Sequence, residues 1–270
     1  YGILQIQSGR SRSIEREYVE GSYWSGGLYS KEMIRDIYKQ RTQFEDAAIL
    51  LTDLVIEEPE QIVPALRAVQ QAQISSLFIM ASQISDQVKG VLSVNQKSGR
   101  LQVVAVKVPG LRLDDQMMAL EDLAVLTGGQ PFFRAAGDTL EHVTPESFGR
   151  ARKIWADMNY LGLVGGRNDP ILRRQHIHKL SQAYHQAEEA DMRNKLRDRV
   201  GRLYSGAAVL WIGGMTESEI NMRKELAQRT AETLRSAIYG GVVVGGGVSL
   251  IACQPTLREQ MGSNPDPDAQ

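Results

Sequence analysis

The residue types that most often carry out chemistry are few in this chain and do not gather into a motif. Of four histidines, His176 and His178 are two residues apart in a predicted helix, so they point to different faces. His178 and His185 share a face but are two turns apart, too far to chelate one ion directly. We interpret these histidines as part of a solvated helix face and predict no metal site.

Adjacent carboxylates occur twice, at Asp114–Asp115 and Glu188–Glu189. They have the right groups for acid–base catalysis, but their places at the ends of predicted helices favour helix-dipole and surface roles. The single cysteine, Cys253, has no plausible histidine partner in the sequence, so a buried, unreactive thiol is the default interpretation. No catalytic cluster follows from these residues.

Glycine and valine are concentrated near the end of the chain, in "IYGGVVVGGGVSLIACQ" (residues 238–254). Glycine at this density usually brings the backbone close to a phosphate or to another element. The stretch matches neither the P-loop pattern G-x-x-x-x-G-K-[ST] nor the dinucleotide pattern G-x-G-x-x-G. By motif alone a close-packed strand–helix junction is favoured, and contact with phosphate remains the alternative.

Composition limits the partners and the compartment. The 270 residues include 31 basic and 32 acidic ones, for a net charge of −1, so no long-range field favours nucleic acid or a membrane surface. One cysteine excludes an intrachain disulfide and suits a reducing, cytoplasmic location. No run approaches the ~20 apolar residues that span a bilayer. The opening "YGILQIQSG" has no methionine and no signal peptide, which we interpret as a piece of a longer protein.

Strands and helices alternate through the first half of the chain. Short strands are predicted within residues 1–20, and buried strands at 47–56 and 75–81 flank a helix at 58–73. A helix at 85–96, a strand at 101–108, a helix at 114–129 that ends in glycines, and a strand at 130–135 follow. This order predicts an α/β domain with a substantially parallel sheet.

The second half begins with a highly charged segment at 169–205 that carries an intermittent apolar stripe. We predict two amphipathic helices, broken near Ala190–Asp191 and packed as a hairpin. A strand at 206–214 and a long helix at 216–241 follow, with Thr216 as the cap and Glu219 as the third helical residue. The tail 262–270 is expected to be disordered.

Several segments, in the same order, resemble the group I chaperonins, the GroEL family. The motifs are K-x-P-G and L-T-G-G within 104–130, K-L-x-x-R-V-x-x-L and G-x-x-T-E within 191–219, and G-V-V-x-G-G-G within 234–251. Residues 48–69 are also similar. Each motif is weak by itself, but their order, nearly without gaps over residues 1 to about 255, makes the resemblance specific.

The resemblance implies a fold and a division into domains. The fold would be a chaperonin apical-domain-like β/α sandwich with an amphipathic helical hairpin and a small, discontinuous α+β intermediate domain. Residues 1–19 and 207–240 would form the two parts of the intermediate domain, 20–206 the apical polypeptide-binding domain, and 241–270 the start of the equatorial domain with a disordered tail. Gly21 and Gly206 match the paired hinge glycines, a role for which glycine's wide φ/ψ range is suited.

The family binds unfolded polypeptide in an apolar groove between two helices and along a nearby extended segment. The matching positions are Leu28, Met33, Val63, Leu66 and Val94. At three further positions the chain departs from the family: Glu32 replaces an aromatic residue, and Lys89 and Ser93 replace aliphatic ones. These changes predict a more polar groove, or one that has lost general client binding. For Val63 and Leu66 alone, packing of the helix onto the core is an equal alternative.

A further departure concerns nucleotide hydrolysis. The family binds ATP and Mg²⁺, and the resemblance makes Gly245, Gly246 and Gly247 part of an incomplete nucleotide site. Arg229 occupies the position of the family's aspartate that orients the hydrolytic water. Arginine accepts no hydrogen bond and cannot act as a base, whereas Glu225 and Glu232 are spaced to pair with it. We therefore expect no catalytic residue, no cofactor in this piece, and slow or absent turnover in the intact protein.

Our leading interpretation is a chaperone fragment that binds unfolded or partly folded polypeptide through an apolar apical groove. A lid co-chaperonin is a further partner implied by the family, which forms rings; we expect the fragment to be a monomer or a weak oligomer. A degenerate chaperonin-like scaffold without general folding activity is the alternative. An unrelated α/β enzyme is a third interpretation, and it predicts a deep polar pocket that no titratable cluster in the sequence suggests.

Overall fold

The computed structural model describes residues 3–9, 11–19, 21–97, 101–204 and 207–263. Contacts divide the chain into two compact units. Unit 1 comprises Tyr1–Gln5 and Arg16–Leu210, and unit 2 comprises Ile6–Glu15 and Trp211–Gln270. Among the described residues no helix is long and apolar enough to cross a membrane.

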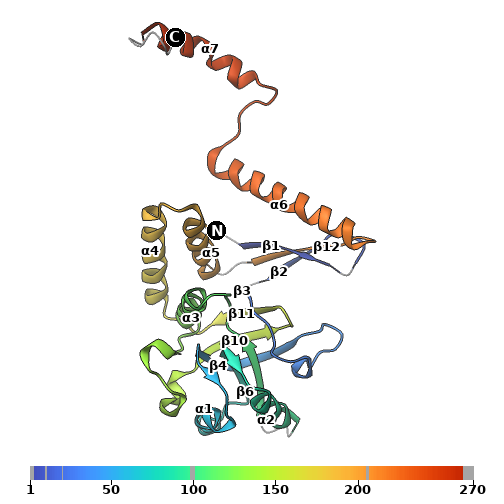
Figure 1. Ribbon diagram of the computed structural model, residues 1–270, viewed down its shortest axis with the longest axis vertical. Helices are drawn as coiled ribbons and strands as arrows, with labels where there is room; N and C mark the ends of the chain where they lie inside the picture. The colour runs from blue at the N-terminus through green and yellow to red at the C-terminus, as the bar shows by residue number, and fades with distance from the viewer. Residues whose placement is uncertain (1–2, 10, 20, 98–100, 205–206, 264–270) are drawn as a thin grey trace. The chain divides into compact units, whose positions relative to one another are not determined.

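The centre of unit 1 is a seven-stranded sheet with the order β3-β11-β10-β4-β6-β8, to which β9 is added beside β4. Figure 1 shows its strands in the lower part of the view. Their bounds are Ser22–Ser25 for β3, Thr42–Thr52 for β4, Ser76–Ala81 for β6, Gln102–Lys107 for β8, Pro131–Phe132 for β9, Gly149–Ala156 for β10 and Tyr160–Gly166 for β11.

The two halves of this sheet differ in direction. β4 pairs in parallel with β6 and β9, and β6 pairs in parallel with β8. On the other side, β4, β10, β11 and β3 form successive antiparallel pairs. The prediction of a substantially parallel sheet is therefore right for one half and wrong for the other. The antiparallel half arises because a short turn, Asp157–Asn159, joins β10 directly to β11 without a crossover helix.

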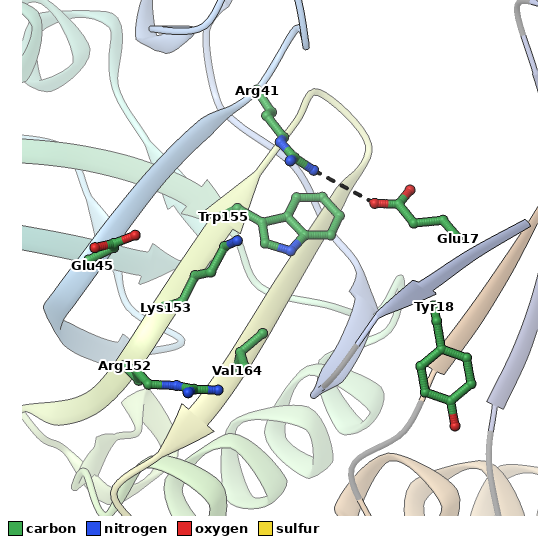
Figure 2. A pocket seen from close by; sticks show the side chains of 8 residues that line it. All are labelled: Glu17, Tyr18, Arg41, Glu45, Arg152, Lys153, Trp155 and Val164. Carbon is green, nitrogen blue, oxygen red and sulfur yellow. Dashed lines mark ion pairs between the residues drawn. The ribbon is translucent and has the colours of Figure 1, made fainter.

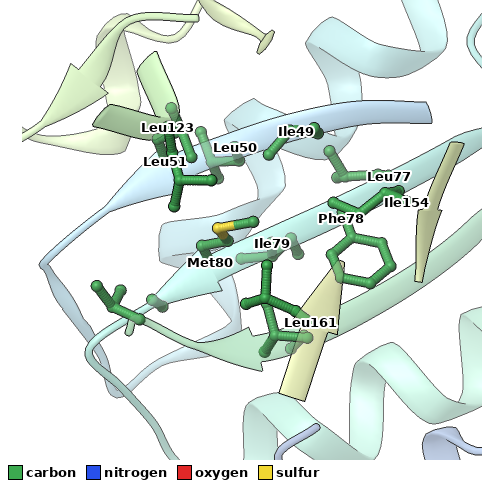
Figure 3. Packing of buried hydrophobic residues seen from close by; sticks show 14 of the residues in the cluster. Ile49, Leu50, Leu51, Leu77, Phe78, Ile79, Met80, Leu123, Ile154 and Leu161 are labelled. Atoms are coloured by element: carbon green, nitrogen blue, oxygen red, sulfur yellow. The ribbon is translucent and has the colours of Figure 1, made fainter. Parts of the chain in front are cut away.

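The core of unit 1 includes residues of both halves of the sheet, and its most continuous apolar runs lie in the parallel half. The strands there are continuous apolar runs, as expected for strands that are covered on both faces. Figure 3 shows Ile49, Leu50 and Leu51 of β4 beside Phe78 and Met80 of β6. All five side chains are fully buried. The Phe44 and Phe78 rings meet edge-on with centroids 5.8 Å apart, a favoured geometry for aromatic pairs.

Three helices pack on this sheet, α1 (Pro59–Gln71), α2 (Asp86–Lys97) and α3 (Leu113–Thr127). In Figure 1, α3 lies on the opposite side of the sheet from α1 and α2. A capping box between Glu58 and Gln61 starts α1, and Pro59 occupies the first turn of this helix. Gly128 ends α3 in the left-handed conformation. These signals are readable in the sequence, and the predicted helices are confirmed.

The helical hairpin is also confirmed. Its helices are α4 (Pro170–Gln186) and α5 (Ala190–Leu203), which pack on each other. The side chain of Asp169 accepts the Ile171 N–H, and Pro170 occupies the first turn of α4. The break falls at residues 187–189, immediately before the predicted Ala190–Asp191.

Smaller elements complete the fold. A three-stranded sheet has the order β1-β12-β2, from Ile3–Ser8, Ala207–Ile212 and Glu15–Val19, and the boundary between the two units runs through its strands. Short strands β5 (Val55–Ile56) and β7 (Gln83–Ile84) pair in parallel. Single-turn helices are η1 (Lys31–Met33), η2 (Arg134–Ala136), η3 (Leu140–His142) and η4 (Pro145–Ser147).

Unit 2 contains two further helices, α6 (Glu217–Gly240) and α7 (Val248–Ser263). The Thr216 hydroxyl accepts the Glu219 N–H at 3.2 Å, as the predicted cap requires. Many apolar side chains of both helices are exposed, including Leu234, Ile238, Leu250 and Ile251. Residues 264–270, which make up most of the tail that we expected to be disordered, lie outside the described residues.

Candidate functional site

A buried ion-pair cluster joins three helices of unit 1. The Asp122 carboxylate of α3 has no exposed surface and accepts two bonds from Arg199 of α5, from Nε and Nη2, each at 2.8 Å. Its Oδ1 also lies 2.7 Å from His176 Nε2 of α4. Two opposite charges and a ring nitrogen thus satisfy one another away from water, as buried charges must. We call Asp122, His176 and Arg199 the three-helix cluster.

The three-helix cluster corrects one sequence prediction. His176 was assigned to a solvated helix face, but its ring is mostly buried against Asp122. His178, by contrast, bonds only Gln182 among the described residues and is exposed. Within the described residues no group of three or more His, Cys, Asp or Glu side chains could hold a metal ion.

The other candidate polar residues serve surface roles. Asp115, in the first turn of α3, lies 2.8 Å from the Lys195 ammonium of α5, and this hydrogen bond lowers the pKa of the carboxyl. Glu188 and Glu189 are exposed at the break in the hairpin. Cys253 is exposed rather than buried as predicted, because α7 has few neighbours that could cover it.

A cavity of about 480 Å³ lies on the antiparallel half of the sheet, and Figure 2 shows the side chains that line it. The Arg41 guanidinium lies 5.4 Å over the Trp155 ring and 4.0 Å from the Glu17 carboxylate. Trp155 lies flat against Gly162, where an added Cβ would be 2.4 Å from the ring. The cavity also includes Arg152, Lys153 and Glu45, so its charges are mixed. Sequence patterns do not indicate this site because its residues come from separate strands and loops.

The predicted groove residues differ in accessibility. Leu28 and Met33 are buried in the core. Leu28 makes a bridge to Val106, and the Met33 carbonyl accepts the Thr42 hydroxyl. Val63 and Leu66, on α1, are half-buried, and the side chain of Val94 lies outside what the structure describes.

Three polar positions flank these residues. Glu32 is exposed, and the Lys89 ammonium lies 2.8 Å from Asp86 and 5.8 Å over the Tyr29 ring. The Ser93 hydroxyl is buried and has no partner among the described residues. Of these three positions, Lys89 places a charged group on α2, Ser93 a buried hydroxyl on the same helix, and Glu32 an exposed carboxylate on η1.

The sequence prediction did not name several other apolar side chains that the structure exposes. Val91 of α2 is 38% exposed, and Ile37 and Tyr38 are 74% and 98% exposed. Ile37 and Tyr38 lie in a turn closed by backbone bonds between Asp36 and Arg41. A search for exposed large side chains beside a charged turn ("RDIYKQR") would have found them. We call Val63, Leu66 and Val91 the α1/α2 apolar surface.

Comparison with known proteins identifies the fold. No protein-family model matches the chain. A crystal structure of the chaperonin gp146 from the bacteriophage EL 2 (Pseudomonas aeruginosa), in the presence of ATP-BeFx, superimposes with a TM-score of 0.63 over 98% of this chain. The chain has a chaperonin-like fold. Sequence identity is 15%, and the chain spans about half (51%) of the length of that chaperonin.

The chaperonin-like fold includes one described hinge candidate. Gly21 has φ of 117°, and a Cβ added there would lie 2.0 Å from the Leu163 carbonyl oxygen, so only glycine fits. Gly206 lies outside the described residues. The hinge role of the pair stays a prediction.

The glycine stretch of this chaperonin-like chain is not the close-packed junction that the motif favoured. Within the described residues, no heavy atom lies within 4 Å of a Cβ added at Gly245, Gly246 or Gly247. Val242, Val243 and Val244 are exposed as well. The described residues therefore build no nucleotide cradle around these glycines, and no catalytic step can be derived through ATP or Mg²⁺ here.

Arg229 lies on the exposed surface of α6. Its guanidinium is 3.9 Å from the Glu225 carboxylate, and the two side chains are 74% and 72% exposed. The sequence spacing predicted that Glu225 could pair with Arg229, and this ion pair is present. An equivalent pair with Glu232 is not among the ion pairs within 4.0 Å on the described part of α6.

Proposed function

We propose that this chain is the polypeptide-binding part of a divergent, GroEL-type chaperonin. The observation that carries the proposal is the chaperonin-like fold over 98% of the chain, together with family-like motifs in the family's order. Fold alone does not define function, so the proposal depends equally on a surface suited to unfolded chains.

The proposed domains follow the family: 1–19 and 207–240 intermediate, 20–206 apical, and 241–270 equatorial. The contact-based boundaries at Arg16 and Leu210 support a discontinuous arrangement of this kind. Unfolded polypeptides, a lid co-chaperonin, ring assembly and a cytoplasmic location belong to the same proposal.

The proposed client surface is the α1/α2 apolar surface. Unfolded clients share apolar side chains and little else, so a chaperone binds them through exposed apolar atoms. Val91 is exposed, and Val63 and Leu66 retain part of their surface. Because Leu28 and Met33 are buried, their part in binding requires a rearrangement of the segment that carries them.

The test is capture of a chemically unfolded, reduced lysozyme by the chain. The double variant Val63→Ser plus Leu66→Ser should weaken binding about thirtyfold, because each change removes roughly 1 kcal/mol of partly buried apolar contact. Leu111→Ser is the matched control, since Leu111 is fully exposed in the loop before α3. It should bind as the parent does.

Two results would contradict the groove assignment. Either the double variant keeps full binding while its thermal unfolding is unchanged, or Leu111→Ser loses as much binding as the double variant. Thermal unfolding of each variant separates a lost contact from a lost fold, because Leu66 also packs against the core.

A scaffold role without general client binding is the second candidate. It is favoured by the burial of Leu28 and Met33 and by the charged Lys89–Asp86 pair on α2, which reduce the apolar surface. It predicts no measurable capture of unfolded lysozyme by the parent chain.

Slow or absent ATP turnover in the intact protein is part of the proposal. It is supported by Arg229, a cation that pairs with Glu225 on an exposed helix face, where the family has an aspartate. Losing one general base typically lowers a rate roughly 10²–10⁴-fold. Turnover by the intact protein at the rate of an ordinary chaperonin would overturn this part.

A further inference from the structure

Two arginines of α5, Arg199 and Arg202, have opposite environments. Arg199 is fully engaged by Asp122 and also reaches the Met118 carbonyl. Arg202 has no carboxylate within ion-pair distance among the described residues. Its guanidinium carbon lies 4.8 Å over the Trp24 ring, and its Nε is buried without a hydrogen-bond acceptor.

A second donor close by has the same deficiency. The indole Nε1 of Trp24 is buried and has no acceptor among the described residues. Trp24 itself is fully buried. Both atoms are N–H groups that can only donate, and a buried donor without an acceptor is costly and rare in folded proteins. Arg202 lines the cavity described next and can take an acceptor from it, whereas Trp24 does not line that cavity and reports on Arg202 through the stacked ring.

A cavity of about 210 Å³ lies next to Arg202, between α3, α5 and the end of β3. Its charged side chains are nearly all neutralised. Asp115 is paired with Lys195, and Asp122 with Arg199. Asp198, which also lines the cavity, is 3.7 Å from Arg197. The rest of the lining is Ser25, Pro109, Gly110, Met118 and Ala119.

The charge on Arg202 is retained in this setting. Burial lowers the pKa of Arg202, but arginine starts so high that it remains a cation at neutral pH. Asp198 and Asp122 attract the Arg202 cation from beyond ion-pair distance, and a desolvated cation without a directly paired carboxylate is unfavourable. An anion in the cavity would pair directly with the Arg202 guanidinium and supply it with a hydrogen-bond acceptor.

We propose that this cavity binds one small oxyanion, a single phosphate or carboxylate group, with Arg202 as the principal ligand. The Ser25 hydroxyl and the Lys195 ammonium line the same cavity and can contribute further donors. A nucleotide is too large for it, since pockets for such ligands measure roughly 300–1,000 Å³. This site is independent of the proposed client surface, with which it shares no residue.

The experiment follows the ¹⁵N-labelled chain by NMR while inorganic phosphate or acetate is added, with chloride at equal ionic strength as the reference. The Trp24 indole N–H and the Arg202 Nε–H signals should move and saturate. The indole signals of Trp155 and Trp211 should stay in place. Phosphate and acetate distinguish the two classes of oxyanion by their dissociation constants.

Substitution of Arg202 gives the second measurement. Arg202→Met should abolish the saturable shift of the Trp24 indole signal and the anion-dependent rise in Tm, which we expect to be about 5 °C at a hundredfold excess over Kd. Without anion, Arg202→Met should melt at the same or a higher temperature, because a desolvated charge is removed. Arg197→Met, on the exposed side of the same helix, is the control and should keep the full response.

Two more variants complete the test. If Arg202→Met does not fold, Arg202→Lys keeps the charge without the Nε donor and should bind at least tenfold more weakly. Asp198→Asn removes a negative charge from the cavity and should bind phosphate a few-fold more tightly.

The proposal fails if chloride moves the Trp24 signal as phosphate does, or if no addition produces a saturable shift. A water molecule then satisfies the donors. It also fails if Arg202→Met binds phosphate normally, or if Asp198→Asn lowers Tm without tightening binding, since Asp198 would then be the partner of Arg202.

Discussion

Two regions of the molecule use the same chemistry, an arginine beside a carboxylate, under opposite conditions. In the three-helix cluster of unit 1, Asp122 and Arg199 are bidentate, at 2.8 Å, and removed from water. On α6 of unit 2, Arg229 and Glu225 are 3.9 Å apart and mostly exposed. The first pair joins helices that are distant in sequence, whereas the second joins adjacent turns of one helix.

The difference shows where charge determines the fold. A buried carboxylate that loses its partners leaves uncompensated donors behind, while an exposed pair is replaced by water at little cost. Arg199 and His176 come from different helices of the hairpin, so the three-helix cluster fixes how α4 and α5 attach to α3. The α6 pair fixes nothing beyond its own helix.

The largest effect is expected at Asp122. Asp122→Ala removes the buried acceptor shared by Arg199 and His176, leaving Arg199 the longer bonds to Glu121 and the Met118 carbonyl, and should lower the free energy of unfolding by about 3–5 kcal/mol. Urea unfolding followed by circular dichroism measures it. Asp114→Ala, at an exposed position of the same helix, is the control and should cost less than about 0.5 kcal/mol. Equal losses in the two variants would show that the buried pair contributes no more to stability than an exposed aspartate does.

A smaller loss is expected at His176. His176→Ala removes one of the bonds to Asp122 while Arg199 remains, so the free energy of unfolding should fall by about 1–3 kcal/mol. His178→Ala removes an exposed ring that bonds Gln182 on its own helix and should change the free energy of unfolding by less than about 0.5 kcal/mol. If the two variants melt at the same temperature, His176 is not part of the buried cluster.

At Asp115 we expect a dependence of stability on pH that is smaller than the losses at Asp122 and His176. The hydrogen bond from Lys195 lowers the pKa of this carboxyl, so the folded state holds its proton less tightly than the unfolded state does. The pair therefore stabilises the chain above the usual pKa of aspartate, about 3.9, and this contribution is lost as the pH falls through the lower folded value. Asp115→Asn should reduce the change in Tm between pH 5 and pH 3, and an unchanged profile would contradict the pairing.

The smallest effect is expected on α6. Glu225→Ala and Arg229→Ala should each change the free energy of unfolding by less than about 0.5 kcal/mol, because an exposed pair contributes little. In about 0.5 M NaCl the parent and both variants should have the same free energy of unfolding, because salt screens the exposed pair. A loss above about 1 kcal/mol in either variant would mean that this pair has more in common with the three-helix cluster than the structure indicates.

The sequence predicted most helices because their signals are local. Pro59, Pro170 and Thr216 mark starts, and Gly128 marks an end. The parallel strands were likewise evident as continuous apolar runs. The hairpin of β10 and β11 was not predicted, since "GRARKIWA" mixes arginine with small residues and its burial depends on neighbours.

The sites were less predictable than the fold for a related reason. Asp122 follows the same local pattern as any helical aspartate, and only the packing of three helices makes it a buried acceptor. Leu28 and Met33 were assigned to an exposed groove by position, yet a bridge to Val106 and a bond from Thr42 place them inside. Such contacts join residues far apart in the chain, so no local rule contains them.

The stacking of guanidinium groups on indoles gives the molecule built-in optical reporters. Trp24 lies under Arg202 and Trp155 under Arg41, and Trp211 belongs to unit 2. Emission from an indole shifts to longer wavelength when water reaches it, so each tryptophan reports on its own surroundings. Single-tryptophan versions of the chain would therefore separate, by fluorescence alone, events in the Arg202 cavity, in the Arg41 cavity and in unit 2.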